Sequence, residues 1–126
     1  MTNEQKRVFI VEDDEHLAKV YAVKFSQEGI ATSFAGTGEG AVSRIAAEKP
    51  DLIILDLMIP RKDGFTVLEE IKKDPSLATI PVLILSNLGQ SSDKKRALDL
   101  GASDYMVKIE HSVQEVFDKA KSYLGK

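Results

Sequence analysis

Fully apolar stretches punctuate this chain at intervals. Residues 8–11, 52–55, 82–85 and 105–107 form four short runs that are apolar at every position. Runs of this kind are typical of parallel strands that are buried on both faces of a sheet. Residues 30–35 are more polar and alternate in character, which favours a fifth strand at an edge of the sheet, where one face meets water.

Between these runs, apolar side chains recur every three or four residues, which is the spacing of one face of an α-helix. Helices are predicted at residues 14–28, around 41–46, around 67–71, at 91–100 and at 113–124. Asp14 stands at the N-cap position of the first helix, and Gly29 suits its C-terminal end. Strand and helix therefore alternate five times, a (βα)5 order that predicts an α/β fold with a doubly wound, five-stranded parallel sheet. We expect residues 1–126 to form a single domain.

Composition narrows the classes of function. The 126 residues contain no cysteine, which excludes disulfides, thiolate catalysis and cysteine-bound zinc. No apolar stretch approaches the ~20 residues that a membrane helix needs, and residues 1–7 lack the apolar core of a signal peptide. We therefore expect a cytoplasmic protein that does not enter a membrane. The net charge of −3 gives no indication of direct nucleic-acid binding.

Each apolar run is followed directly by a residue that suits phosphoryl chemistry. These residues are Glu12, Asp13 and Asp14 after the first run, and Asp56, Ser86 and Lys108 after the others. If the strands are parallel, their carboxyl ends share one edge of the sheet and these side chains meet in one crevice. Three carboxylates repel a phosphate unless a cation intervenes, so the acidic loop favours Mg²⁺ over direct binding of a nucleotide or flavin. We interpret Asp13 as a metal ligand and Asp14 as a helix cap.

Asp56 is the candidate nucleophile, because a carboxylate that attacks phosphorus gives an acyl phosphate. Such a transfer depends on positioning and charge neutralisation more than on acid–base catalysis. Lys108 can supply a mobile positive charge, and the hydroxyl of Ser86 can donate to a phosphoryl oxygen. Each residue alone has an ordinary alternative role, as a solvated lysine or a turn-forming serine. The combination of four strand ends carries the hypothesis.

As a set, these motifs resemble the receiver domain of two-component response regulators over essentially the whole chain. The matching residues are 11–14, 55–60, 63–64, 85–86 and 101–105 leading to Lys108. The resemblance implies a flavodoxin-like sheet with strand order 2-1-3-4-5. It implies that Asp56 takes a phosphoryl group from a sensor histidine kinase or a histidine phosphotransfer protein. Glu12, Asp13, Asp56 and the backbone carbonyl of Met58 would hold Mg²⁺, and the protein would be a signalling switch, not an enzyme with other substrates.

The resemblance also implies a switch that couples the hydroxyl of Ser86 to the ring of Tyr105. In the family, the hydroxyl residue moves toward the phosphoryl group and the aromatic residue turns inward. This would reshape the face made by the fourth helix, the fifth strand and the fifth helix, where we expect a downstream protein to bind. Relatives often form homodimers through the same face. Lys94, Lys95 and Arg96 lie in the fourth helix and suit either a solvated helix face or a docking patch.

Two positions depart from the usual pattern of the family. Ile109 follows Lys108 where proline is usual, often with a cis bond, so we expect a turn that is trans, looser or differently aimed. Asn87 follows Ser86 where a small residue is usual, and it either narrows access to Asp56 or forms a hydrogen bond with the phosphoryl group or a water. Met58 and Leu88 are apolar where the family tunes hydrolysis, which predicts a long-lived phosphorylated state.

Three other functions stay open on the sequence alone. A receiver that no longer takes phosphate would be a constitutive protein-binding module, which Asn87 and Ile109 would favour. A haloacid-dehalogenase-like phosphatase also uses an aspartyl nucleophile, but Met58 occupies the position of its second aspartate. A flavodoxin-like electron carrier shares the sheet order, but the acidic first loop opposes a flavin phosphate. The remaining candidates are interpreted as background, with His16 facing water, His111 without an evident partner, and Gly36, Gly38 and Gly40 in turns or at a helix entry.

Overall fold

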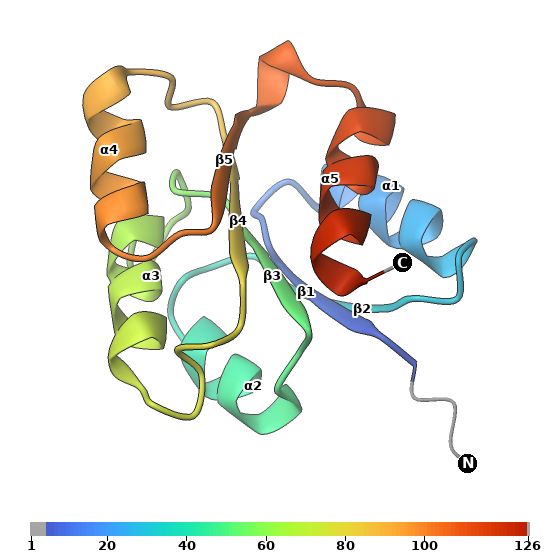
Figure 1. Ribbon diagram of the computed structural model, residues 1–126, viewed down its shortest axis with the longest axis horizontal. Helices are drawn as coiled ribbons and strands as arrows, with labels where there is room; N and C mark the ends of the chain where they lie inside the picture. The colour runs from blue at the N-terminus through green and yellow to red at the C-terminus, as the bar shows by residue number, and fades with distance from the viewer. Residues whose placement is uncertain (1–4, 126) are drawn as a thin grey trace.

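The computed structural model describes residues 5–125, in which strands and helices alternate along the chain (Figure 1). The strands are β1 (Arg7–Val11), β2 (Ala31–Ala35), β3 (Leu52–Leu55), β4 (Val82–Ser86) and β5 (Asp104–Val107). The α-helices are α1 (Glu15–Ser26), α2 (Ala41–Glu48), α3 (Gly64–Lys73), α4 (Ser91–Asp99) and α5 (Val113–Leu124). A short 3₁₀ helix, η1 (Lys108–Glu110), lies between β5 and α5. The predicted α/β order is confirmed.

The strands form one parallel sheet in the order β2-β1-β3-β4-β5, which confirms the predicted topology. The polar strand β2 lies at one edge, as predicted, and all of its residues are partly exposed. In β3 and β4 every residue is buried, in agreement with their continuous apolar sequences. The opposite edge is β5, where Asp104 and Tyr105 are only partly buried. Within the predicted apolar run, Met106 and Val107 are buried as expected, and Tyr105 is partly exposed.

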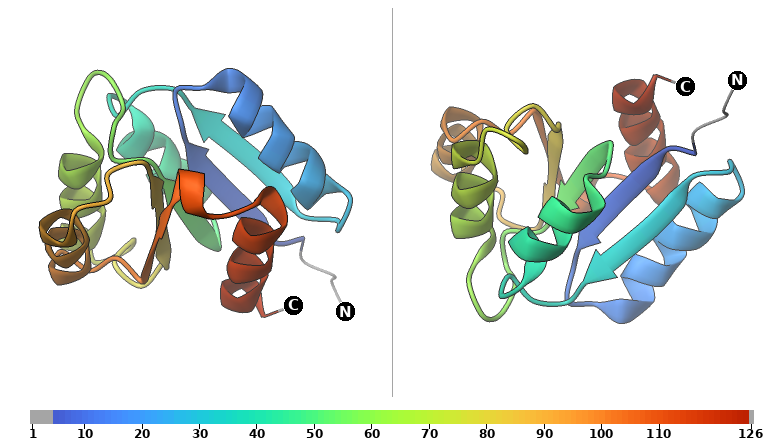
Figure 2. Two further views of the ribbon diagram at one scale, coloured as in Figure 1. Left: turned by 90° about the horizontal axis from the view of Figure 1, so that it is seen from above. Right: turned by 90° about the horizontal axis from the view of Figure 1, so that it is seen from below.

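Helices cover both faces of the sheet. Figure 1 shows α2, α3 and α4 on one side and α1 and α5 on the other, and both views in Figure 2 agree with this division. Alternate residues of each strand enter different cores, because successive side chains of a strand point to opposite faces. In β1, Phe9 and Val11 pack toward α2, α3 and α4, whereas Val8 and Ile10 pack toward α1 and α5. The sheet is therefore buried between two apolar layers.

Local capping explains where the helices begin. The Oδ1 atom of Asp14 accepts a hydrogen bond from the backbone N–H of Leu17 at 3.1 Å, so Asp14 is the N-cap of α1, as predicted. Ser112 and Glu115 form a reciprocal capping box at the start of α5. Gly40 precedes α2 with a φ of 82°, which suits the predicted role at a helix entry. The η1 helix was not predicted, because three residues are too few to show an apolar period. Within the described part of the chain, no helix combines the length and apolar character needed to cross a membrane.

Candidate functional site

The strand register brings three polar side chains together at the carboxyl edge of the sheet. Val11 of β1 pairs with Leu55 of β3, so the residues that follow, Glu12 and Asp56, are neighbours. The backbone N–H of Asp56 donates to the carbonyl of Val11 at 3.0 Å, which extends the ladder by one residue. Lys108 follows β5, two strands away from β3, and its long side chain reaches both carboxylates.

Lys108 is paired with two buried carboxylates. Its Nζ atom lies 2.7 Å from Oδ2 of Asp56 and 2.5 Å from Oε1 of Glu12. Burial alone would lower the pKa of Lys108, but its hydrogen bonds with Asp56 and Glu12 outweigh burial, and the pKa is raised. Burial raises the pKa of Glu12, and the hydrogen bond with Lys108 offsets only part of this effect. Lys108 therefore carries its charge at neutral pH, in direct contact with the candidate nucleophile.

Asp13 completes an acidic cluster with Glu12 and Asp56. One carboxylate oxygen from each residue lies within 4.8 Å of the other two. Glu12 and Asp56 are buried, whereas Asp13 is exposed to solvent. Mg²⁺ prefers hard oxygen ligands and usually keeps several waters, so a cluster that is open to water on one side fits this ion. Asp14 has a different role, because its carboxylate caps α1.

The loop after β3 holds Asp56 in place. Oδ1 of Asp56 accepts a hydrogen bond from the backbone N–H of Met58 at 2.9 Å, and Gly64 donates its N–H to the carbonyl of Leu57 at 3.1 Å. A side-chain carbon added at Gly64 would lie 2.4 Å from the backbone oxygen of Asp56, so this close contact requires glycine. The sequence included Gly64 in a motif but gave no sign of this packing role. That the Met58 carbonyl is a metal ligand stays a prediction.

Ser86 and Tyr105 lie on the neighbouring strands β4 and β5 and meet at the loop after β4. Ser86 is fully buried, and its Oγ atom lies 3.5 Å from the backbone N–H of Leu88. The hydroxyl of Tyr105 donates to the carbonyl of the same Leu88 at 2.5 Å. Burial, together with the negative charges of Asp93 and Asp56, raises the pKa of Tyr105 to about 12, so its hydroxyl remains a donor at neutral pH. One short loop therefore connects the two residues of the predicted switch.

The two positions that depart from the usual family pattern contact each other. Oδ1 of Asn87 accepts a hydrogen bond from the backbone N–H of Ile109 at 3.2 Å. All peptide bonds of the described residues are trans, as expected for a turn without proline, and Lys108 nevertheless points at Asp56. The apolar pattern of the sequence does not connect Asn87 with Ile109, because only the pairing of β4 with β5 places the two loops side by side.

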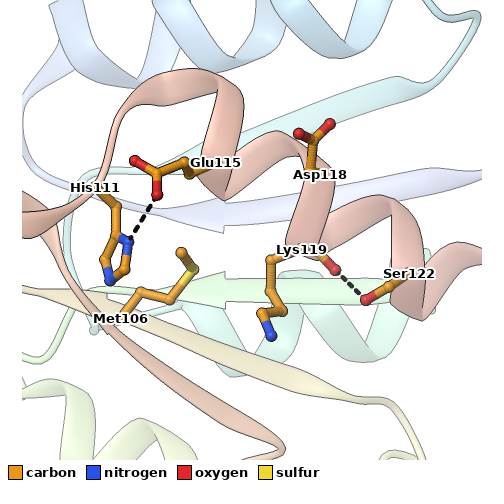
Figure 3. A pocket seen from close by; sticks show the side chains of 6 residues that line it. All are labelled: Met106, His111, Glu115, Asp118, Lys119 and Ser122. Carbon is orange, nitrogen blue, oxygen red and sulfur yellow. Dashed lines mark hydrogen bonds and ion pairs between the residues drawn. The ribbon is translucent and has the colours of Figure 1, made fainter.

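A shallow hollow lies on the β5–α5 part of the predicted partner-binding face (Figure 3). Its lining side chains are Met106, His111, Glu115, Asp118, Lys119 and Ser122. Nδ1 of His111 lies 3.6 Å from Oε2 of Glu115, which makes an ion pair only when the imidazole is protonated. This buried Nδ1 has no hydrogen-bond partner among the described residues, in agreement with the sequence interpretation. The contact arises because the two residues are four apart at the start of α5, a spacing that brings side chains together.

The basic residues of α4 are largely engaged within the protein. The guanidinium carbon of Arg96 lies 4.0 Å from the centre of the Phe65 ring and so joins α4 to α3. Lys95 pairs with Asp99 along α4 at 2.7 Å. Lys95 and Arg96 are still exposed, so the structure leaves both a solvated helix face and a docking patch open for the basic residues. His16 is exposed and lies outside the acidic cluster, in agreement with its interpretation as a water-facing residue.

Comparison with known proteins adds a family to this geometry. Residues 8–119 match the family model described as "Response regulator receiver domain". The chain is 36% identical over 118 residues to the DNA-binding dual master transcriptional regulator RpaA of Synechocystis, covering 94% of this chain and 48% of that protein. It is 34% identical over 119 residues to the alkaline phosphatase synthesis transcriptional regulatory protein PhoP of Bacillus subtilis, with the same two coverages of 94% and 48%. The chain thus spans about half the length of these curated relatives.

Solved structures show the same architecture. A putative response regulator from Chloroflexus aurantiacus superposes with a TM-score of 0.87 at 29% identity, covering 98% of this chain and all of that chain. A CheY-like response regulator receiver domain protein from Methanospirillum hungatei gives a TM-score of 0.89 at 22% identity, with coverages of 97% and 95%. At that lower identity the likeness shows the fold alone.

Proposed function

The chain belongs to the receiver domains of two-component response regulators, and from this premise we propose that it is a phosphorylation switch with Asp56 as the phosphoacceptor. The donor is the phosphohistidine of a sensor histidine kinase or of a histidine phosphotransfer protein. The observation that carries the proposal is the contact of Lys108 with Asp56 at 2.7 Å, beside an acidic cluster that fits a divalent cation.

The chemistry requires a carboxylate to approach a negatively charged phosphoryl group. An oxygen of Asp56 forms a bond to phosphorus while the P–N bond of the phosphohistidine breaks, and the imidazole nitrogen keeps the electron pair and binds a proton. The carboxylates of Glu12, Asp13 and Asp56 carry three negative charges against one positive charge on Lys108. Bound Mg²⁺ would supply positive charge that offsets the negative charge of the phosphoryl oxygens.

Residues of this chain would hold both the metal and the new phosphoryl group. Glu12, Asp13, Asp56 and the backbone carbonyl of Met58 are the proposed ligands of Mg²⁺, since oxygen donors of this kind suit that ion. Lys108 can form an ion pair with a phosphoryl oxygen on Asp56, because its ammonium group already contacts that carboxylate. The hydroxyl of Ser86 can donate to a second phosphoryl oxygen.

The response to phosphorylation is proposed to pass through the loop after β4. A move of Ser86 toward the phosphoryl group displaces Leu88, whose carbonyl accepts from the hydroxyl of Tyr105. Tyr105 then changes its position on β5, and the face formed by α4, β5 and α5 changes with it. We assign the downstream protein to this face, and a homodimer would use the same surface. The hollow beside His111 and Lys119 in Figure 3 offers a concave surface to which another protein could bind.

We further propose that residues 1–126 are one receiver domain in the cytoplasm. A single sheet between two apolar cores supports one domain for the described residues, while residues 1–4 and 126 lie outside them.

Intact-mass measurement after incubation with Mg²⁺ and acetyl phosphate tests the function. We expect one added phosphate per chain, and none for Asp56→Asn or in the presence of EDTA. Asp99→Asn serves as a control, because this exposed carboxylate only pairs with Lys95 on α4. If the unaltered chain stays unphosphorylated with both acetyl phosphate and a histidine kinase, the proposal fails and the constitutive binding module is favoured.

A further inference from the structure

The turn that carries Lys108 has little support of its own. The η1 helix is a single 3₁₀ turn and none of its three residues is buried. Its closing hydrogen bond, from the N–H of His111 to the carbonyl of Lys108, is long at 3.4 Å. The side chain of Ile109 is 82% exposed and gives the turn almost no apolar anchoring. A proline ring, which would restrict the backbone at this point, is absent.

Support comes from the loop after β4. The N–H of Ile109, directly after Lys108, donates to Oδ1 of Asn87 at 3.2 Å. Three residues before Lys108, the hydroxyl of Tyr105 donates to the carbonyl of Leu88 at 2.5 Å. The segment that presents Lys108 is therefore attached to the β4 loop on both sides. The Asn87 contact depends on a free N–H at position 109, which proline would lack.

We infer that Asn87 is a positioning residue for phosphoryl transfer: its side-chain oxygen holds the Ile109 N–H and thereby fixes the backbone that aims Lys108 at Asp56. The inference rests on the proposed function and deepens it. The hydrogen bond joins the residue after Ser86 to the residue after Lys108. It therefore links the two backbone segments whose side chains, Ser86 and Lys108, would bind the phosphoryl oxygens. Asn87 then neither blocks the way to Asp56 nor bonds to the phosphoryl group.

The first test compares initial phosphorylation rates with acetyl phosphate and Mg²⁺ in the full chain. Asn87→Ala should slow the reaction about fivefold, which corresponds to the ~1 kcal/mol of a typical net hydrogen bond. Asn87→Asp keeps an acceptor at the same place but adds a negative charge that repels the anionic donor, so its rate should lie between those of Asn87→Ala and the unaltered chain. Gln5→Ala is the matched control, since it removes another exposed hydrogen bond between an amide side chain and the backbone, at Gly29. Its rate should equal that of the unaltered chain.

The second test removes the other partner of the hydrogen bond. Replacing Ile109 by its α-hydroxy acid turns the N–H into an ester oxygen and keeps the side chain. In this ester background, Asn87→Ala should have no further effect on the rate. An equal slowing in both backgrounds overturns the inference and favours direct contact of Asn87 with the phosphoryl group. Faster phosphorylation of Asn87→Ala overturns it in favour of a side chain that narrows access to Asp56.

Amide hydrogen exchange separates this inference from the proposed function, because it needs no phosphate. The exchange rate of the Ile109 N–H should rise about fivefold in Asn87→Ala and stay unchanged in Asn87→Asp and Gln5→Ala. Unchanged exchange in Asn87→Ala overturns the inference even if the chain is phosphorylated normally. If no variant or unaltered chain accepts phosphate while exchange responds as expected, the contact stands but the proposed function and the positioning role both fail.

Discussion

Replacing Lys108 with methionine removes an ammonium group but keeps most of the length of the side chain. The carboxylates of Glu12 and Asp56, whose side chains are only 4% and 5% exposed, would remain in place without this partner. Removing one member of a buried ion pair typically costs about 3–5 kcal/mol of stability, because the other charge stays buried and uncompensated. A carboxylate can avoid this cost by binding a proton. The free energy needed to bind that proton is therefore an upper limit on the stability lost through that carboxylate.

The limit depends on pH. Holding a proton on a carboxyl group costs about 1.36 kcal/mol for each pH unit above its pKa in the unfolded chain. Glu12 is the group expected to bind the proton, since burial already raises its pKa from the ordinary value of 4.5. The part of the loss that comes from Glu12 is then at most roughly 3.4 kcal/mol near pH 7 and roughly 0.7 kcal/mol near pH 5, and the unpaired charge of Asp56 adds its own cost. A raised pKa in the folded state gives stability that is present at low pH and lost as the pH rises, so the deficit of Lys108→Met must grow with pH.

Urea unfolding followed by circular dichroism, in EDTA at both pH values, measures this difference. Added Mg²⁺ should reduce the deficit at pH 7, because the cation takes over part of the role of the ammonium group. Lys73→Met is the control, since Lys73 forms an exposed pair with Glu69 at 3.6 Å, and it should change little at either pH. An equal loss at both pH values would mean that packing, not charge, causes the effect. No loss at pH 7 would refute the view that Lys108 stabilises the buried carboxylates.

Asp13→Asn should raise the free energy of unfolding in EDTA by on the order of 1 kcal/mol, because it removes a like charge from beside Glu12 and Asp56, and it should weaken the stabilisation by Mg²⁺. Lower stability of Asp13→Asn in EDTA would count against this. Met58→Asn should speed the loss of phosphate severalfold, because a polar side chain at this 55% exposed rim position can orient an attacking water; an unchanged dephosphorylation rate would contradict a long-lived state. An ultraviolet difference titration between the unaltered chain and Tyr105→Phe should show the Tyr105 phenol ionising near pH 12, and a midpoint near 10 would refute its burial.

Much of the site could be predicted because the carboxyl ends of parallel strands meet at one edge of a sheet. Asp56 and Lys108 are 52 residues apart in sequence, yet each follows a recognisable apolar run, and the structure places them in contact. The positions of single hydrogen bonds could not be predicted in this way. The Asn87–Ile109 contact depends on which way two exposed turns bend, and an apolar pattern carries no information about that.

The structural roles of the glycines could likewise be predicted only in part. The sequence marks Gly40 as a helix-entry residue, and its positive φ agrees. The role of Gly64 depends on how closely the start of α3 approaches the backbone at Asp56, which is a property of packing between segments. A glycine in a turn can be recognised from its neighbours in the sequence, whereas a glycine that allows two distant segments to pack closely cannot.

The close packing at Gly64 also bears on which side of the crevice, β3 or β4 and β5, changes its conformation more easily. A side-chain carbon at Gly64 would lie 2.4 Å from the Asp56 carbonyl oxygen, so on the β3 side the start of α3 packs directly against the backbone of the acceptor residue. On the β4 and β5 side, the loops are joined by single hydrogen bonds at Leu88 and Asn87, each of which contributes only about 1 kcal/mol. If Asp56 takes a phosphoryl group as proposed, we expect the β4 and β5 side to accommodate the added charge, so the structural change would be directed toward α4 and α5 and away from α3.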